Sequence, residues 1–239
     1  MYRAHRLAWS GIDLVFPPIC GGCGKAGKRW CSGCQLRVPF IRVHYCQTCG
    51  VPNKGVKTCD KCRSNPPAYR MMRSWAVFAS PVQNALHTLK YRRNAGIGDA
   101  LARQLADFVR SLEWNIDLLI PVPLGKNRLK ERGYNQVGLV AEPLAYEVGW
   151  GYAPHALWKS RETRSQVGLS ISQRRENVLD AYQADREIVK RKSILLMDDV
   201  VTTGSTIQSC SQALLDAGAR EVYALSIARA LSHHDLKRV

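Results

Sequence analysis

Residues 194–206 read ILLMDDVVTTGST, the most informative segment of the chain for its fold. The run 193–197 predicts a strand buried on both faces, because the four residues after Ser193 are all apolar. Two adjacent carboxylates and a loop of small hydroxylated residues follow. Residues 205–217 then predict a helix that Gly218 ends. Ligands bind outside the carboxyl ends of parallel strands, so this order predicts a ligand site directly after the strand.

The residues of this predicted site suit a sugar phosphate. Two neighbouring carboxylates can accept hydrogen bonds from vicinal sugar hydroxyls. The loop offers backbone N–H groups and hydroxyls to a phosphate, and the following helix adds the positive end of its dipole. The alternative is an acidic turn before a helix capped by Ser or Thr. We predict Asp198 and Asp199 as the catalytic pair and, as phosphate-binding residues, Val200, Val201, Thr202, Thr203, Gly204, Ser205 and Thr206.

The rest of the chain from residue 74 onward alternates between strand-length apolar runs and amphipathic helical patterns. Strands are predicted over residues 75–79, 116–122, 193–197 and 221–228. Helices are predicted over residues 82–94, 98–112, 136–148 with an interruption at Pro143, and 205–217. This alternation predicts an α/β domain with a mostly parallel central sheet.

The N-terminal segment holds eight of the nine cysteines, arranged in four Cys-x-x-Cys pairs. Each pair can aim two thiolates at one metal ion, and structural zinc sites take four ligands. We therefore predict two structural zinc ions; disulfides or redox motifs are the alternatives. Pairs that are consecutive in the sequence could share a zinc, or the pairs could interleave. The predicted ligands are Cys20, Cys23, Cys31, Cys34, Cys46, Cys49, Cys59 and Cys62.

Positive charge is concentrated in the same segment. The chain of 239 residues has 35 Lys and Arg against 19 Asp and Glu, a formal net charge of +16. Residues 1–73 contribute 13 of these bases but only Asp13 and Asp60 as acids. Such a surface suits a polyanion, and Trp30 and Tyr45 could stack on unpaired bases; the alternative is a solvated basic surface with these aromatic residues packing a thin core. The basic residues of interest are Arg29, Arg37, Arg42, Lys54, Lys57, Lys61 and Arg63.

Domain boundaries and location follow from composition. The segment Asn65-Pro66-Pro67 has the character of a linker, so we predict a zinc-binding domain over residues 1–68 and an α/β domain over 69–239. No apolar run approaches the roughly 18–20 residues of a membrane span. Ser10, Gly11 and Asp13 interrupt the N-terminal apolar stretch, so it does not read as a signal peptide. We expect a cytoplasmic protein without a membrane span.

The acidic pair and its loop resemble the motif with which type I phosphoribosyltransferases bind phosphoribosyl pyrophosphate (PRPP). Further segments extend the resemblance to about residues 15–230: the four cysteine pairs, Leu89-Lys90-Tyr91, Pro121-Val122-Pro123-Leu124 and Arg132-Gly133-Tyr134-Asn135-Gln136. Together these segments resemble the ComF/GntX family. The resemblance implies a phosphoribosyltransferase-like, parallel-sheet domain preceded by a double zinc ribbon.

The resemblance also implies roles for residues. Asp198 and Asp199 would meet the ribose hydroxyls, and the loop from Thr202 to Thr206 would cradle the 5′-phosphate. Basic groups after the second strand and in a flap near residues 161–177 suit the pyrophosphate of PRPP with Mg²⁺; surface loops are the alternative. The expected pyrophosphate residues are Pro123, Leu124, Arg128, Arg132, Arg161 and Arg164.

Two functions are compatible with these residues. The favoured one, implied by the resemblance, is a protein that binds PRPP or a nucleotide and single-stranded DNA during DNA uptake, transformation or DNA utilisation, together with a protein partner of the uptake machinery. The alternative is an active phosphoribosyltransferase that displaces pyrophosphate from PRPP with an acceptor that the sequence does not identify.

Overall fold

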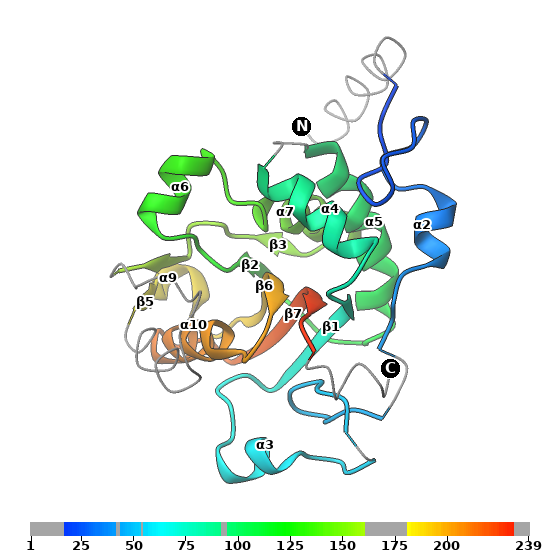
Figure 1. Ribbon diagram of the computed structural model, residues 1–239. Coiled ribbons are helices and arrows are strands. Elements are labelled where there is room, and N and C mark those ends of the chain that lie inside the picture. The colour runs from blue at the N-terminus through cyan, green and yellow to red at the C-terminus, as the bar shows by residue number, and fades with distance from the viewer. Residues whose placement is uncertain (1–16, 42–43, 54, 92–94, 161–180, 232–239) are drawn as a thin grey trace.

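The computed structural model describes residues 17–41, 44–53, 55–91, 95–160 and 181–231. At its centre lies a five-stranded parallel sheet with the order β1-β7-β6-β2-β3 (Figure 1). The strands are β1 (Met71–Val77), β2 (Leu118–Pro121), β3 (Gly151–Tyr152), β6 (Ser193–Val201) and β7 (Glu221–Arg229). The predicted α/β architecture with a parallel sheet is confirmed, and the strand of the acidic pair, β6, is central.

Both faces of this sheet are covered. The first face carries α4 (Val82–Tyr91), α5 (Ala95–Arg110) and α7 (Gly138–Val148), which share a buried cluster with Leu195 and Met197 of β6. The second face carries α9 (Arg186–Val189), α10 (Ser205–Asp216) and the antiparallel pair β4 (Leu157–Lys159) and β5 (Tyr182–Ala184), which share a cluster with Ile194 and Leu196. Successive strand residues point to opposite faces. This burial on both sides explains the uninterrupted apolar run.

The cysteine-rich segment packs directly against the sheet domain. Cys20, Trp30 and Cys34, near α2 (Ser32–Leu36), belong to the buried cluster of the first face. Cys46 and Cys62, near α3 (Asp60–Ser64), belong to the cluster of the second face. Figure 1 shows α2 and α3 at separate places on the body. The division of the chain at residues 68 and 69 stays a prediction.

Two strand boundaries differ from the sequence prediction by four residues, the end of β6 and the start of β1. β6 continues past residue 197 to Val201, because β7 pairs with it as far as Val201 and Arg229. Asp198 and Asp199 therefore lie inside the last part of the strand and not after it. β1 begins at Met71 and not at the predicted residue 75, because Met71 pairs with Tyr223 of β7.

Helix α7 runs through Pro143 without the predicted interruption. Pro143 has no N–H, so the carbonyl of Leu139 loses its helical partner. That carbonyl lies against Gly98 of α5, where a Cβ would collide with it. The proline and the glycine together let α5 and α7 approach closely.

Several short elements were not predicted. The basic run after β2, expected as a connection, forms α6 (Lys126–Arg132), which buries none of its residues. The short strands β3, β4 and β5 and helix α9 have only two to four residues each, too few for a periodic signal. The ninth cysteine, Cys210, is fully buried in α10, where it packs as a small core residue. Across the described ranges, every helix falls short of the length and apolar character that crossing a membrane requires.

Candidate functional site

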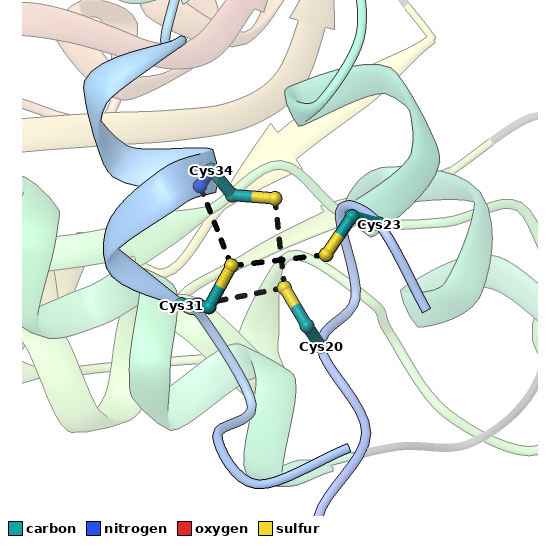
Figure 2. Close-up of side chains that lie close together, drawn as sticks. All are labelled: Cys20, Cys23, Cys31 and Cys34. Carbon is teal, nitrogen blue, oxygen red and sulfur yellow. Dashed lines mark hydrogen bonds between the residues drawn. The ribbon is translucent and has the colours of Figure 1, made fainter. Parts of the chain in front are cut away.

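The paired cysteines form two compact clusters, one in the first ribbon (residues 20–34) and one in the second ribbon (residues 46–62). Within each cluster the four sulfur atoms lie within 4.8 Å of one another. Figure 2 shows the sulfur atoms of Cys20, Cys23, Cys31 and Cys34 turned toward a common centre. Consecutive pairs thus share a site, which settles the choice between consecutive and interleaved pairing.

The sulfur spacing fits zinc. The Sγ–Sγ distance is 3.6 Å between Cys20 and Cys34, and 3.8 Å between Cys49 and Cys59. A tetrahedron with zinc–sulfur bonds of about 2.3 Å places its sulfur atoms about 3.8 Å apart, whereas a disulfide bond is about 2.05 Å long. All nine cysteines are free thiols. The two clusters therefore fit two structural zinc ions and not a disulfide framework.

The first cysteine of each ribbon has a lowered pKa, which favours its thiolate form. Burial opposes the charge of Cys20, but backbone N–H groups from three neighbours outweigh it and lower the pKa to about 6. The pKa of Cys46 is lowered to about 6 in the same way. Burial, and then the neighbouring thiols, raise the pKa of Cys34 to about 12. A divalent cation among the sulfur atoms would relieve this mutual repulsion.

At the end of β6, Asp199 is held by two side chains on the first face. Its Oδ2 lies 2.6 Å from Lys90 Nζ and accepts a hydrogen bond from Gln136 Nε2 at 3.2 Å. Burial opposes the carboxylate charge, but the Lys90 ammonium and the two hydrogen bonds hold the pKa of Asp199 below its usual range. Asp199 is therefore ionised, and the positive charge of Lys90 compensates its negative charge.

The adjacent Asp198 is in a different state. Its Oδ1 accepts a hydrogen bond from the backbone N–H of Asp199 at 2.8 Å. Burial and then the charge of Asp199 raise the pKa of Asp198 to about 8. A carboxyl group whose charge the protein leaves poorly compensated near neutral pH is typical of a functional site. Hydroxyl donors of a ligand could supply the missing stabilisation.

Two motifs far apart in the sequence meet at this acidic pair. Lys90 lies in the last turn of α4, and the Tyr134 hydroxyl donates to the carbonyl of neighbouring Leu89. Arg132 Nη1 donates to Gln136 Oε1 at 2.9 Å. From the sequence, Lys90 and Gln136 were equally well explained as helix-end and first-turn residues. The only signal for their role was their place in the motifs that carry the family resemblance.

The loop over residues 202–206 leads from β6 into α10. The hydroxyls of Thr203 and Ser205 lie 2.8 Å apart. Gly204 is the N-cap of α10 and has φ +81°, a left-handed conformation that favours glycine. Gly204 has no side chain to cap the helix, and in the first turn of α10 the Ser205 N–H donates to Thr203 Oγ1 in the loop at 3.4 Å. The predicted phosphate-binding residues therefore lie together at the carboxyl end of the central strand.

The loop after β2 begins at the same edge of the sheet as the acidic pair, because β2 and β6 are parallel neighbours. β2 pairs with β6, and the Val122 N–H donates to the carbonyl of Met197 at 2.8 Å. Asn135 Nδ2 donates to the Val122 carbonyl at 2.9 Å and so fixes the start of this loop. The structure thus brings the loop after β2 to the same edge of the sheet as Asp198.

The basic residues expected at the pyrophosphate are distributed unevenly. Arg132 joins the acidic network through Gln136, and its guanidinium lies 5.6 Å from the centre of the Tyr91 ring. Arg128 lies on the exposed helix α6. Arg161 and Arg164 lie outside the described residues. Pyrophosphate binding by these residues stays a prediction.

The expectation that Trp30 stacks on nucleic-acid bases is wrong. Trp30 is only 8% exposed, its ring centre lies 6.3 Å from that of Trp75, and its Nε1 donates to Gln35. Tyr45 lies beneath the guanidinium of Arg73, 4.9 Å from its ring centre. Arg42 and Lys54 lie outside the described residues. The surface charge of the ribbons rests on exposed residues, among them Lys25, Lys28, Arg37, Lys57, Lys61 and Arg63.

Known proteins are similar both to the cysteine-rich segment alone and to nearly the whole chain. Residues 11–63 match the double zinc ribbon domain family. The DNA utilization protein YhgH of Salmonella typhimurium is 32% identical over 228 residues, which cover 91% of this chain and all of that protein. Competence protein F of Haemophilus influenzae is 29% identical, over 84% of this chain and 90% of that protein. A solved adenine phosphoribosyltransferase from Thermoanaerobacter pseudethanolicus overlaps 57% of this chain and 83% of that one, with 17% identity and a TM-score of 0.37.

Proposed function

Because the chain belongs to the ComF/YhgH family of competence and DNA utilization proteins, we propose that it binds PRPP or a nucleotide phosphate, together with Mg²⁺, at the carboxyl end of β6. We propose further that it handles single-stranded DNA in DNA uptake or utilisation. The observation that carries the phosphate proposal is the convergence of Asp198, Asp199 and the loop over residues 202–206 at one edge of the sheet.

Each group at this edge has a role in the proposed complex. Asp198 accepts hydrogen bonds from the ribose hydroxyls, and the loop with the first turn of α10 holds the 5′-phosphate. Lys90 and Gln136 keep Asp199 ionised and in place. Mg²⁺ bound with PRPP would neutralise the pyrophosphate charge. The loop containing Pro123 and Leu124, at the same edge, is the proposed neighbour of that pyrophosphate.

Calorimetric titration of PRPP with Mg²⁺ into the zinc-loaded full-length chain tests this site. The double variant Asp198→Asn with Asp199→Asn keeps the side-chain shapes and should weaken binding at least about tenfold, because charged acceptors are lost. Asp107→Ala, on the exposed side of α5, is the matched control and should bind like the wild type. Unchanged affinity in the double variant would contradict the site assignment.

The DNA proposal is supported by the basic ribbons and by the competence and DNA utilization proteins in the family. Deletion of residues 1–68 is a poor test, because cysteines of both ribbons belong to the buried clusters of the sheet. Charge removal is better: Lys25→Gln with Lys28→Gln on the first ribbon, and Lys57→Gln with Arg63→Gln on the second. Each lost phosphate contact should reduce the slope of log affinity against log salt by about 0.7. Unchanged slopes in both variants would exclude the ribbons as the DNA contact.

Phosphoribosyl transfer is the second candidate function. It is favoured by the loop after β2, which lies beside the acidic pair at the edge where a leaving pyrophosphate would stand. The chain would then act by positioning PRPP and stabilising charge, without a covalent nucleophile. Incubation with PRPP, Mg²⁺ and a panel of bases and amines, with pyrophosphate release as the measurement, tests this function.

Two further proposals concern the whole chain. We propose a cytoplasmic location, because eight cysteines arranged as metal ligands need a reducing compartment to stay thiolates. We also propose the division into residues 1–68 and 69–239. A protein partner in DNA uptake belongs to the same proposed role.

A further inference from the structure

Lys61 of the second ribbon reaches the loop that follows β6. Its Nζ donates to the carbonyl oxygen of Thr203 at 3.0 Å, across 142 residues of sequence. Nearby, the Ala68 N–H donates at 2.9 Å to Oε1 of Gln208 in the first turn of α10. The segment around the second ribbon therefore touches both the loop and the helix of the candidate phosphate site.

The position of Lys61 depends on the metal ligands around it. Lys61 lies in α3, a helix of five residues, between Cys59 and Cys62. A helix this short is not stable by itself in water. The Cys59 N–H donates to Cys46 Sγ at 3.3 Å, so the cluster itself fixes the start of the helix. Zinc in the second cluster would thus hold Lys61 at the loop.

The second ribbon is in turn fixed to the sheet. The Met72 N–H of β1 donates to the carbonyl of Thr48 at 2.7 Å, and the buried Arg229 side chain of β7 donates to the carbonyl of Cys49 at 2.6 Å. Gly50 has φ +68°, and a Cβ there would come 2.7 Å from the Met72 carbonyl. The ribbon backbone therefore lies directly on β1, and its place relative to β6 is set by backbone contacts.

We propose that Lys61 binds the phosphate held by the loop over residues 202–206, so that the second ribbon completes the ligand site. This inference rests on the proposed function of that loop. The contact with Thr203 uses one of the three N–H donors of the ammonium, and a phosphate oxygen at the rim of the loop can accept another. The Lys61 side chain is exposed and open to a ligand. The ligand class is the phosphate monoester of a sugar or nucleotide.

Calorimetry on the zinc-loaded full-length chain tests this role with three ligands: ribose 5-phosphate, PRPP with Mg²⁺, and pyrophosphate with Mg²⁺. Lys61→Met should weaken ribose 5-phosphate and PRPP about tenfold each, because a charged hydrogen bond is lost. Pyrophosphate has no 5′-phosphate, so its affinity should not change. Lys61→Arg should stay within about threefold of the wild type. Arg63→Met, on the same exposed helix, is the matched control and should change none of the three affinities.

The outcomes separate this inference from the proposed function. If Lys61→Met retains two zinc ions and binds ribose 5-phosphate within twofold of the wild type, Lys61 only supports the loop and the inference is wrong. An equal loss of pyrophosphate affinity would point to a general charge effect and would also overturn it. If the wild type binds neither ribose 5-phosphate nor PRPP, the proposed function itself fails, and the role of Lys61 fails with it.

Discussion

The two faces of the sheet each carry one zinc ribbon, but the ribbons make different contacts. On the first face, the ribbon packs on α4 and α5: Asn84 Nδ2 donates to the Gly22 carbonyl at 2.8 Å, and a Cβ at Gly21 would come 2.7 Å from Ile97. On the second face, the ribbon packs on β1 and β7 and reaches the loop after β6 through Lys61. The clusters themselves are alike in sulfur spacing and in the low pKa of their first cysteine.

The two carboxyl groups of the acidic pair, Asp198 and Asp199, also differ between the two faces of the sheet. Asp199 is compensated by Lys90 and Gln136 from the first face, whereas the pKa of Asp198 is raised to about 8. Side chains from the first face therefore fix Asp199, whereas Asp198, which points to the second face, is the carboxyl group that we expect a ligand to contact. Two clusters with the same ligand chemistry can therefore have different roles in one protein. What the cluster touches decides whether it only supports the fold or also contributes to a binding site.

The largest expected effect comes from removing one zinc ligand at a time. Cys23→Ser and Cys59→Ser each remove one partly exposed ligand, the second ligand of the first ribbon and the third ligand of the second ribbon. Each should lower the zinc content from two ions to one and the free energy of unfolding by about 4 kcal/mol or more. Only Cys59→Ser should also abolish PRPP binding, measured at a temperature where both variants are folded. Equal loss of PRPP binding in both variants would contradict the claim that only the second ribbon contributes to the ligand site.

A second prediction concerns the arginine beside each cluster. Four thiolates around Zn²⁺ leave a net negative charge. Near the second cluster this charge faces the buried Arg229, which is 2% exposed, whereas Arg37 lies exposed with its Nη2 3.7 Å from Cys34 Sγ. Arg229→Met should cost about 3 kcal/mol and Arg37→Met less than about 1 kcal/mol. Denaturant unfolding at fixed zinc concentration measures both, and similar costs would contradict the account.

The two carboxylates should affect stability with opposite signs. The pKa of Asp198 is raised to about 8 in the folded protein, so its contribution to stability falls as the pH rises from about 4 to 8. Asp198→Asn should therefore stabilise the ligand-free chain at pH 8 by roughly 1–2 kcal/mol relative to wild type, with little difference at pH 4. The pKa of Asp199 is lowered, so its contribution is present above about pH 4 and is lost as the pH falls below its folded value. Asp199→Asn should destabilise at pH 8, and thermal unfolding across this pH range would show whether the signs differ.

The smallest expected effect compares two glycines. Gly204, before α10, and Gly149, after α7, have φ of +81° and +80°, and a Cβ at either position would meet no close contact. Alanine at each position should cost about 1 kcal/mol through the left-handed conformation alone. Only Gly204→Ala should also weaken ribose 5-phosphate binding, because it changes the loop. A matching loss in Gly149→Ala would show that binding follows general stability.

The features that the sequence predicts well are short, contiguous segments of the chain. The acidic pair with its loop and the four cysteine pairs depend on backbone geometry within a few residues, so their local patterns are informative. The end of β6 was mispredicted because β7 extends the pairing beyond the apolar run. The contacts of Lys90 and Gln136 with Asp199 depend on how α4 and the start of α7 pack on the sheet, which no local pattern contains. Lys61 could not be distinguished from any other solvated basic residue for the same reason.

The most direct test of the account is zinc release to a chelating dye, with and without PRPP and Mg²⁺. Binding and metal retention are reciprocally linked if the second ribbon is part of the ligand site. Cys23→Ser and Cys59→Ser each keep one cluster, so they show which phase of zinc release belongs to which ribbon. The Asp198→Asn with Asp199→Asn variant, in which PRPP binding is weakened, corrects for zinc that PRPP itself binds in solution. PRPP should slow release from the second ribbon at least about threefold and leave release from the first ribbon unchanged. If PRPP binds but both rates stay the same, or both slow equally, the second ribbon has no special part in the ligand site.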